Sequence, residues 1–216
     1  MTASVAKAGC RVIVFARAPE PGKVKTRLIP ALGEAGAAAL YRRLVLHAIG
    51  AAKDSDSGPV ELWCAPDASQ PFFAECARRL GVSLHAQPEG DLGERMRQAF
   101  IAVLGRSARA ILVGSDIPGL SAEYLRDAER SLAGGYDVVI GPAEDGGYVL
   151  IGLKRCDPEL FREISWGRPT VLAETRRHIA RLGLSCHELP ALWDVDRPGD
   201  LERLSGEMRP PFRSAD

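Results

Sequence analysis

The sequence predicts an α/β fold in which helices cover both faces of a mainly parallel central sheet. Short apolar segments alternate with segments of helical periodicity, which is the pattern of βα units. In addition, 46% of the residues are hydrophobic and 26% are charged, the proportions of a globular protein with a packed core. The predicted strands are residues 11–15, 60–64, 82–86, 110–113, 137–140, 148–153 and 184–189.

Apolar residues recur at helical spacing between these strands, so helices are expected to pack on the sheet. Leu40, Leu44 and Ala48 form one such set, and residues 92–104 contain another. Two further helices are expected to begin after capping hydroxyl residues. These residues are Ser121 and Thr170. Residues 141–167 interrupt the alternation, because two strands follow each other there without a helix between them.

Length and charge limit the possible functions. A chain of 216 residues predicts one domain, residues 1–216, with a frayed tail at about 209–216. Lys and Arg together number 28, as do Asp and Glu, so no overall field attracts nucleic acid or an anionic membrane. No apolar run is long enough for a membrane span. The five cysteines form no C-x-x-C pair, which indicates reduced thiols. Residues 1–11 contain no apolar run of the length found in signal peptides, so a cytoplasmic location is expected. The sequence predicts no particular oligomeric state.

Basic residues are concentrated in the loop that follows the first predicted strand. Arg17, Lys23, Lys25 and Arg27 lie within eleven residues, and Gly22 frees the backbone between them. In an open α/β sheet, ligands bind beyond the carboxyl ends of the strands, so this loop is a candidate cradle for a polyphosphate. The alternative is a solvated basic loop. The loop matches neither a P-loop nor G-x-G-x-x-G, which removes the main support for an ATPase or a dinucleotide-dependent oxidoreductase.

An aspartate follows the apolar strand at residues 110–113. Asp116 is a candidate ligand for Mg²⁺ or Mn²⁺, because these hard cations prefer oxygen ligands, and Ser115 beside it is a candidate nucleotide contact. A turn into Pro118 is the structural alternative. Later in the chain, Asp194 and Asp196 are candidate second metal ligands, although Asp196 could instead cap the short helix that follows it.

Two further loops are candidates for contacts with nucleotide and acceptor. Residues 90–93 stand where a strand gives way to a helix, so Gly90, Asp91 and Gly93 either contact the nucleotide or cap the helix. In the second loop, Asp145 could accept hydrogen bonds from substrate hydroxyls, and adjacent glycines allow close approach of the backbone; a tight hairpin turn explains the same residues. The acceptor candidates are Asp145, Gly146, Gly147, Tyr148 and Trp166.

Six motifs in chain order resemble a family described as the selenodomain-associated or glycosyltransferase A-like transferases. They are Phe15-Ala16-Arg17, Pro21-Gly22-Lys23-Val24-Lys25-Thr26-Arg27-Leu28, Gly90-Asp91-Leu92-Gly93, Gly114-Ser115-Asp116-Ile117-Pro118, Asp145-Gly146-Gly147-Tyr148 and Asp194-Val195-Asp196. More distantly, the chain resembles phospholactate guanylyltransferase and the molybdenum-cofactor guanylyltransferases. The resemblance implies a Rossmann-like nucleotide-diphospho-sugar transferase fold, with Asp116 and an aspartate of the late motif near a metal. The chain departs from the family at Trp166-Gly167 and at Arg197-Pro198, where Trp-Ser or Trp-Thr and Thr-Pro are frequent.

The leading hypothesis is transfer of a nucleoside monophosphate from a nucleoside triphosphate to a small phosphorylated acceptor, with release of pyrophosphate. Such reactions require charge neutralisation and positioning more than a protein nucleophile. The catalytic candidates are Lys25, Arg27 and Asp116, with Arg17 and Lys23 on the outer phosphates. One alternative is a glycosyltransferase that uses a nucleotide sugar, although the usual Asp-x-Asp pair is absent at the middle strand. Another is a nucleotide-binding module without catalytic activity.

Overall fold

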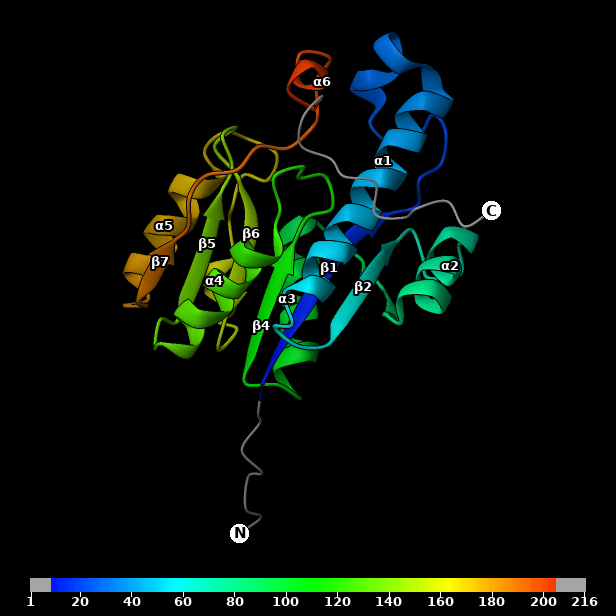
Figure 1. The fold of residues 1–216 in the computed structure, drawn as a ribbon. Helices are drawn as coiled ribbons and strands as arrows, with labels where there is room; N and C mark the ends of the chain where they lie inside the picture. Colours follow the sequence, from blue (N-terminus) through cyan, green and yellow to red (C-terminus); the bar gives the residue numbers. More distant parts are fainter. Residues whose placement is uncertain (1–8, 205–216) are drawn as a thin grey trace.

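The computed structural model describes residues 9–204, which are arranged around a seven-stranded sheet in the order β3-β2-β1-β4-β6-β5-β7 (Figure 1). The strands are β1 (Cys10–Arg17), β2 (Val60–Ala65), β3 (Ser83–Ala86), β4 (Arg109–Val113), β5 (Val138–Pro142), β6 (Tyr148–Leu153) and β7 (Cys186–Glu188). Each predicted strand is confirmed with small shifts at its ends. The frayed tail expected at residues 209–216 lies outside the described residues.

Strand β6 runs antiparallel to its neighbours β4 and β5, whereas the other strand pairs of the described sheet are parallel. A hairpin at residues 143–147 joins β5 to β6 and replaces a crossover helix. The hairpin follows the carboxyl end of β5, and Gly114 N, just after β4, donates to Val149 O at 3.1 Å. The interruption predicted in residues 141–167 therefore places a loop at the sheet edge where β1 and β4 end.

Helices cover both faces of the sheet, as the sequence predicted (Figure 1). One face carries α1, α2 and α4, and the other carries α3 and α5. Helix α2 and the amino-terminal half of α1 were not predicted. The helices are α1 (Ile29–Asp54), α2 (Pro71–Leu80), α3 (Leu92–Leu104), α4 (Ala122–Ala133), α5 (Val171–Arg181) and α6 (Asp200–Arg203), with short 3-10 helices η1 (Thr26–Leu28) and η2 (Pro158–Leu160).

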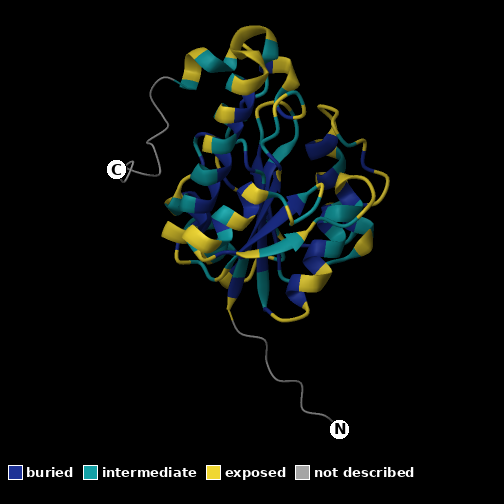
Figure 2. Cartoon of the chain, turned by 90° about the vertical axis from the view of Figure 1, so that its right-hand side faces the viewer, coloured by how far each residue is buried: buried dark blue, intermediate teal, exposed yellow. Residues whose placement is uncertain are grey.

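The core forms two layers, one on each side of the sheet. On β1, Val12 and Val14 contribute to the layer beneath α1 and α4, while Ile13 and Phe15 contribute to the layer beneath α3. Figure 2 shows the resulting pattern, with buried strands inside and exposed residues on the outer surfaces of the helices. Strands buried on both faces explain why these segments read as continuous apolar runs in the sequence.

The two predicted helix caps differ. Ser121 Oγ accepts a hydrogen bond from Tyr124 N at 3.1 Å, so it caps α4 as expected. Thr170 stands at the N-cap position of α5, but its side chain accepts no hydrogen bond from the first turn. With φ of −90° and ψ of −9°, its backbone is already helical rather than extended, which is not the usual backbone of a capping residue.

The cysteines and the helices bear on the predictions of reduced thiols and of no membrane span. All five cysteines are free thiols, and burial raises the pKa of Cys10 and Cys64 to about 12. Within residues 9–204, no helix combines the length and the hydrophobicity that crossing a bilayer requires.

A buried carboxylate joins three strands to the end of α3. The side chain of Glu61 on β2 is 1% exposed. It accepts hydrogen bonds from Arg106 at 2.7 Å, from Arg11 at 3.1 Å and from the indole of Trp63 at 3.3 Å, and His85 Nε2 lies 3.3 Å away. Such a charge is tolerated in the interior because its partners replace the lost hydration.

We expect the substitution Glu61→Ala to destabilise the protein by about 1–3 kcal/mol, because it removes the shared partner of Arg11 and Arg106 and leaves the buried indole N–H of Trp63 without an acceptor. Urea unfolding followed by circular dichroism measures the change. The matched control is Glu123→Ala, which removes an exposed partner of Arg126 and Arg130 and should cost at most about 1 kcal/mol. Equal effects of the two substitutions would contradict the assigned role of Glu61.

Candidate functional site

A cleft with two adjoining pockets lies at the carboxyl ends of the strands. The larger pocket has a volume of about 780 Å³ and is lined by the basic loop after β1 and by the loops after β3 and β4. The smaller has a volume of about 200 Å³ and is lined mainly by the β5–β6 hairpin and the segment before α5. Both pockets are lined by Leu92, Gly114, Asp116 and Tyr148. Asp116 therefore stands where the two pockets meet.

Lys25 and Asp116, which are far apart in the sequence, form an ion pair in this cleft. Lys25 Nζ lies 2.7 Å from Asp116 Oδ2, and the Lys25 side chain is only 7% exposed, against 34% for Asp116. Lys25 adopts a left-handed backbone conformation with φ of 46° and ψ of 43°. This conformation is unfavourable for a residue with a side chain, so the loop holds it in place, with Val24 and Leu28 buried on either side.

The carboxylates around Lys25 keep it charged. Burial alone would lower the pKa of Lys25, but Asp116, Asp196 and Asp194 together raise the pKa above its ordinary value. The ammonium group is therefore present throughout the physiological pH range. It places a fixed positive charge at the end of the loop that was predicted to bind phosphates.

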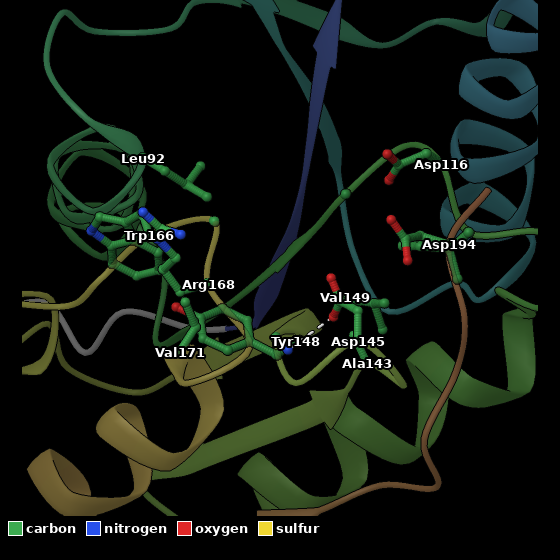
Figure 3. A pocket seen from close by; sticks show the side chains of 14 residues that line it. Leu92, Asp116, Ala143, Asp145, Tyr148, Val149, Trp166, Arg168, Val171 and Asp194 are labelled. Atoms are coloured by element: carbon green, nitrogen blue, oxygen red, sulfur yellow. Dashed lines mark hydrogen bonds between the residues drawn. The ribbon is translucent and has the colours of Figure 1, made fainter. Parts of the chain in front are cut away.

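Asp194 lies beside Asp116 on one wall of the smaller pocket, opposite Leu92 and Trp166 (Figure 3). Burial, together with the negative charges of Asp116 and Asp145, raises the pKa of Asp194 to about 6, and Lys25 partly opposes this. Val195 N donates to Asp116 O at 3.0 Å, which holds the 194–196 segment against the loop after β4. Negative charge therefore exceeds positive charge around Asp194, because the carboxylates of Asp116 and Asp145 outnumber the ammonium group of Lys25.

Asp196 points to a different partner. Its carboxylate forms an ion pair with Arg27 of the basic loop. Asp196 does not cap the following helix: α6 begins after Gly199, and Asp200 Oδ2 accepts from Asp196 N at 2.9 Å and from Arg197 N at 2.7 Å. The capping alternative for Asp196 is therefore wrong, because Gly199 is the N-cap residue of α6 and no described side chain caps this helix.

The donor set fits one divalent cation, provided that a substrate completes its coordination. Asp116 and Asp194 offer carboxylate oxygens, the ligands that Mg²⁺ and Mn²⁺ prefer. Among the described residues, no three His, Cys, Asp or Glu side chains are grouped closely enough to hold a metal alone. Mg²⁺ commonly keeps waters and takes substrate phosphates beside one or two carboxylates, which matches a site of this kind.

The other residues predicted to bind the nucleotide have mixed positions. Arg17 and Lys23 are exposed on the wall of the larger pocket, and Lys23 forms an ion pair with Glu20 at 2.6 Å. Ser115 is buried, and its Oγ lies 2.9 Å from the hydroxyl of Tyr41, which in turn accepts from Arg17 N at 2.9 Å. Ser115 therefore joins the loops after β1 and β4 through Tyr41. Gly22 permits the turn of the basic loop with φ of 76°.

The three residues at the start of α3 that were predicted to contact the nucleotide differ in their positions. Gly90 and Asp91 line the larger pocket, and Asp91 Oδ1 also accepts from Glu94 N at 2.9 Å, so it caps α3. Gly93 lines neither pocket. A Cβ atom at Gly93 would lie 2.6 Å from the indole of Trp166, so the absence of a side chain allows Trp166 to pack on the first turn of α3. The structure therefore shows a packing role for Gly93, and its nucleotide contact stays a prediction.

Four of the five acceptor candidates line the smaller pocket: Asp145, Gly147, Tyr148 and Trp166. Gly146 does not, because a Cβ atom there would lie 2.2 Å from Pro169 O, and its own carbonyl accepts from Leu172 N at 2.9 Å. Asp145 Oδ1 accepts from Gly147 N at 2.9 Å, so the hairpin-turn role coexists with a place in the pocket.

Several pocket residues were not predicted from the sequence. Gln87 and Arg95 line the larger pocket, and Tyr41 contributes from α1. Among the described residues that line the smaller pocket, Arg168 is the only basic one. Gln87 directly follows a predicted strand, so its position carried a usable signal. The places of Tyr41, Arg95 and Arg168 depend on how helices and loops pack, which their spacing in the sequence did not indicate.

The sheet, the helices on both faces and the cleft at the strand ends define a nucleotide-diphospho-sugar transferase fold, as predicted. The chain belongs to the family described as "Uncharacterized protein conserved in bacteria (DUF2064)", which matches residues 48–168. A candidate nucleotide-diphospho-sugar transferase from Desulfovibrio desulfuricans G20 is 36% identical, with 92% of this chain and 87% of that chain aligned and a TM-score of 0.83.

Two more distant solved structures share the fold. An inositol-1-phosphate CTP transferase from T. maritima is 11% identical, with 92% of this chain and 98% of that chain covered and a TM-score of 0.58. Rv0371c from Mycobacterium tuberculosis H37Rv, in complex with manganese, is 16% identical, with 93% of this chain and 100% of that chain covered and a TM-score of 0.56. No curated protein matches the chain in sequence.

We expect Gly93→Ala to displace Trp166 and to destabilise the protein by about 1–3 kcal/mol through overpacking. Urea unfolding and tryptophan fluorescence measure these effects. Gly50→Ala in α1 is the matched control, since a Cβ atom there meets no other atom within 4 Å and the better helix former should stabilise by about 0.5–1 kcal/mol. Gly93→Ala with unchanged fluorescence and stability would show that the contact with Trp166 imposes no constraint.

Proposed function

We propose that the protein is a divalent-metal-dependent nucleotidyltransferase that transfers a nucleoside monophosphate from a nucleoside triphosphate to a small phosphorylated acceptor. The observation that carries this proposal is the Lys25–Asp116 ion pair, with 2.7 Å between Nζ and Oδ2, at the junction of two pockets. The larger pocket accommodates the nucleotide, and the smaller accommodates the acceptor. The reacting phosphate then lies at Asp116, between them.

The cations of the basic loop are already neutralised by carboxylates in the free protein. Lys25 is paired with Asp116, and Arg27 with Asp196. A triphosphate that reaches the loop competes with these carboxylates for Lys25 and Arg27. Mg²⁺ or Mn²⁺ held by Asp116 and Asp194 would supply positive charge beside the transferring phosphate. When both bind, the triphosphate would therefore be neutralised by Lys25 and Arg27, and the released carboxylate of Asp116 would be neutralised by the divalent cation.

The transfer step requires no protein nucleophile. A phosphate oxygen of the acceptor forms a bond to the α-phosphorus, the bond from that phosphorus to the bridging oxygen breaks, and pyrophosphate leaves with the electron pair. Lys25 and Arg27 stabilise the negative charge that accumulates on the α-phosphate and on the leaving group. Arg17 and Lys23, exposed at the rim of the larger pocket, bind the outer phosphates.

The smaller pocket suits a compact acceptor that carries both an anionic group and hydroxyls. Arg168 provides the positive charge for the acceptor phosphate, and Asp145 can accept hydrogen bonds from hydroxyls. Trp166 and Tyr148 form an aromatic wall, with their rings edge to face at 6.3 Å. The inositol-1-phosphate CTP transferase of the same fold is named for a reaction of this class, and this supports the choice of acceptor.

Glycosyl transfer from a nucleotide sugar is the second candidate, because the relative from Desulfovibrio desulfuricans is a candidate nucleotide-diphospho-sugar transferase. The aspartates of the Asp-x-Asp sequence at 194–196 have different partners, however. Asp194 lies beside Asp116, whereas Asp196 pairs with Arg27. This division favours nucleotidyl transfer, in which basic side chains hold a triphosphate. Release of pyrophosphate distinguishes the reactions, since glycosyl transfer releases a nucleoside phosphate instead.

We expect Lys25→Ala to reduce pyrophosphate release by at least about 100-fold, because it removes the buried positive charge at the junction of the pockets. Pyrophosphate is measured with nucleoside triphosphates and a panel of small phosphorylated acceptors, and circular dichroism confirms the fold. Lys53→Ala, at the far end of α1 from the basic loop, is the matched control and should retain full activity. Full activity of Lys25→Ala would exclude the proposed mechanism.

Chelation by EDTA should abolish activity, and Mg²⁺ or Mn²⁺ should restore it. Asp194→Asn should raise the Mn²⁺ concentration for half-maximal activity by about tenfold or more, since even residues that only orient a metal ligand cost 10–100-fold in affinity. Asp196→Asn should change this concentration less, because Asp196 pairs with Arg27. Asp67→Asn on an exposed loop serves as the control. Equal shifts for Asp194→Asn and Asp196→Asn would contradict the assignment of Asp194 as a ligand.

A further inference from the structure

Tyr41 reaches the cleft from α1 and stands where β1 and β4 separate. The ladder between the two strands ends at Val14 and Val113, whereas β1 itself continues to Arg17. Arg17 N donates a hydrogen bond to the Tyr41 hydroxyl at 2.9 Å, and the same hydroxyl lies 2.9 Å from Ser115 Oγ, just beyond the end of β4. One hydroxyl group from a helix therefore bridges the two strand ends that lead into the loops of the cleft.

The direction of each hydrogen bond in this chain of groups can be assigned. A backbone N–H only donates, so the phenol oxygen of Tyr41 accepts from Arg17. Ser115 Oγ can accept through two lone pairs, and a phenol is the more acidic and hence the better donor of two hydroxyls, so Tyr41 donates to Ser115. Burial, followed by the negative charge of Asp116, raises the pKa of Tyr41, so the phenol keeps this proton at neutral pH. The hydrogen bonds therefore run from Arg17 N through Tyr41 to Ser115.

The hydroxyl proton of Ser115 is left without an acceptor. The two hydroxyls carry two protons, and the contact between them uses only one. Apart from Tyr41, no group within residues 9–204 forms a hydrogen bond with Ser115 Oγ, although the residue is only 4% exposed. A buried donor without a partner costs free energy, and a ligand that supplies an acceptor removes this cost. Ser115 lines the larger pocket, so a ligand there can supply it.

The surroundings of Ser115 favour an anionic acceptor. Ser115 directly precedes Asp116, whose carboxylate lies 2.7 Å from Lys25 Nζ. Lys25 is close enough to lower the pKa of Tyr41 in part, and Arg17, at the other end of the hydrogen-bonded chain, lines the same pocket. A neutral donor between two cationic side chains suits an oxygen of a phosphate, because hydrogen bonds to charged groups are stronger than those between neutral groups.

We propose that Tyr41 is a positioning residue for the nucleotide: by donating to Ser115 Oγ, it directs the proton of the Ser115 hydroxyl toward a phosphate oxygen. The inference rests on the proposed function, because it requires a triphosphate in the larger pocket. Without the Tyr41 hydroxyl, the proton of Ser115 can turn to other directions and Arg17 N loses its acceptor. The effect of Tyr41 on the ligand is therefore transmitted through Ser115.

Binding of triphosphates to the full chain tests this role. The affinities of Tyr41→Phe, Ser115→Ala and the double variant for ATP, CTP, GTP and UTP are measured by calorimetry in the presence of Mg²⁺. We expect Ser115→Ala to weaken binding of the preferred nucleotide by about tenfold or more, because a hydrogen bond to a charged group is lost. Tyr41→Phe should weaken it by about fivefold, the effect of one hydrogen bond between neutral groups.

The double variant shows whether Tyr41 acts through Ser115. It should bind the nucleotide as weakly as Ser115→Ala alone, because residues that act through one shared contact are not additive. Losses that multiply in the double variant would overturn the inference. Unchanged affinity in either single variant would do the same.

Tyr124→Phe is the matched control. It also removes a buried hydroxyl that makes a hydrogen bond, since Tyr124 donates to Pro190 O at 2.9 Å, but Tyr124 lines neither pocket. Urea unfolding should show comparable losses of stability for the two Tyr→Phe variants, whereas only Tyr41→Phe should lose affinity for the nucleotide. Equal losses of affinity would reveal a general structural effect and would exclude a specific role of Tyr41.

Inorganic tripolyphosphate is the second probe, because it has phosphate oxygens but neither ribose nor base. Its affinity should fall in Ser115→Ala by a factor similar to that for the nucleotide. A loss confined to nucleotides would contradict the assignment of a phosphate oxygen as the acceptor.

Pyrophosphate release, measured on the same samples, separates this inference from the proposed function. Triphosphate binding by the wild-type protein without pyrophosphate release would defeat nucleotidyl transfer, while the affinities of the variants would still decide the role of Tyr41. Pyrophosphate release together with unchanged affinities in both single variants would have the opposite meaning. Absence of binding for every triphosphate would overturn both.

Discussion

The attraction between Lys25 and Asp116 joins the two halves of the cleft. Lys25 belongs to the loop after β1 and Asp116 to the loop after β4, and these adjacent strands bring the side chains to 2.7 Å. The surrounding carboxylates stabilise the charge of an ammonium group that is only 7% exposed, and the ammonium group in turn reduces the repulsion between these carboxylates. Three further features hold the loops around this ion pair. They are the left-handed backbone of Lys25, the buried contact between Tyr41 and Ser115, and the ion pair of Arg27 with Asp196.

The antiparallel strand β6 explains how the smaller pocket is built. A continuous βα alternation would place a helix after β5, but the chain instead turns back through the hairpin at 143–147 and pairs with β4. This brings Asp145 and Tyr148 to the edge of the sheet that also carries Asp116. The segment that follows then returns Trp166 to α3, where Gly93 makes room for the indole. The smaller pocket is a direct result of this topology.

The central strands were predictable because strands that are buried on both faces give continuous apolar runs, whereas α2 and the amino-terminal half of α1 were not predicted. The site was predictable where residues stand at strand exits, as Lys25 and Asp116 do, since the carboxyl ends of parallel strands meet at one edge. Residues that reach the cleft from helices or packed loops, such as Tyr41 and Arg168, gave no comparable signal. The contact of Gly93 with Trp166 was not predicted, because a glycine in a first helical turn suggests anion binding and gives no signal that an aromatic ring packs on it.

The β5–β6 hairpin has a further consequence for how this architecture can diversify. Most of the residues around the smaller pocket come from one contiguous stretch, from Ala143 to Val171, whereas the walls of the larger pocket are gathered from loops spread along the chain. Exchange of this single stretch would therefore reshape most of the smaller pocket while changing the larger pocket mainly at Tyr148, the residue of the stretch that lines both.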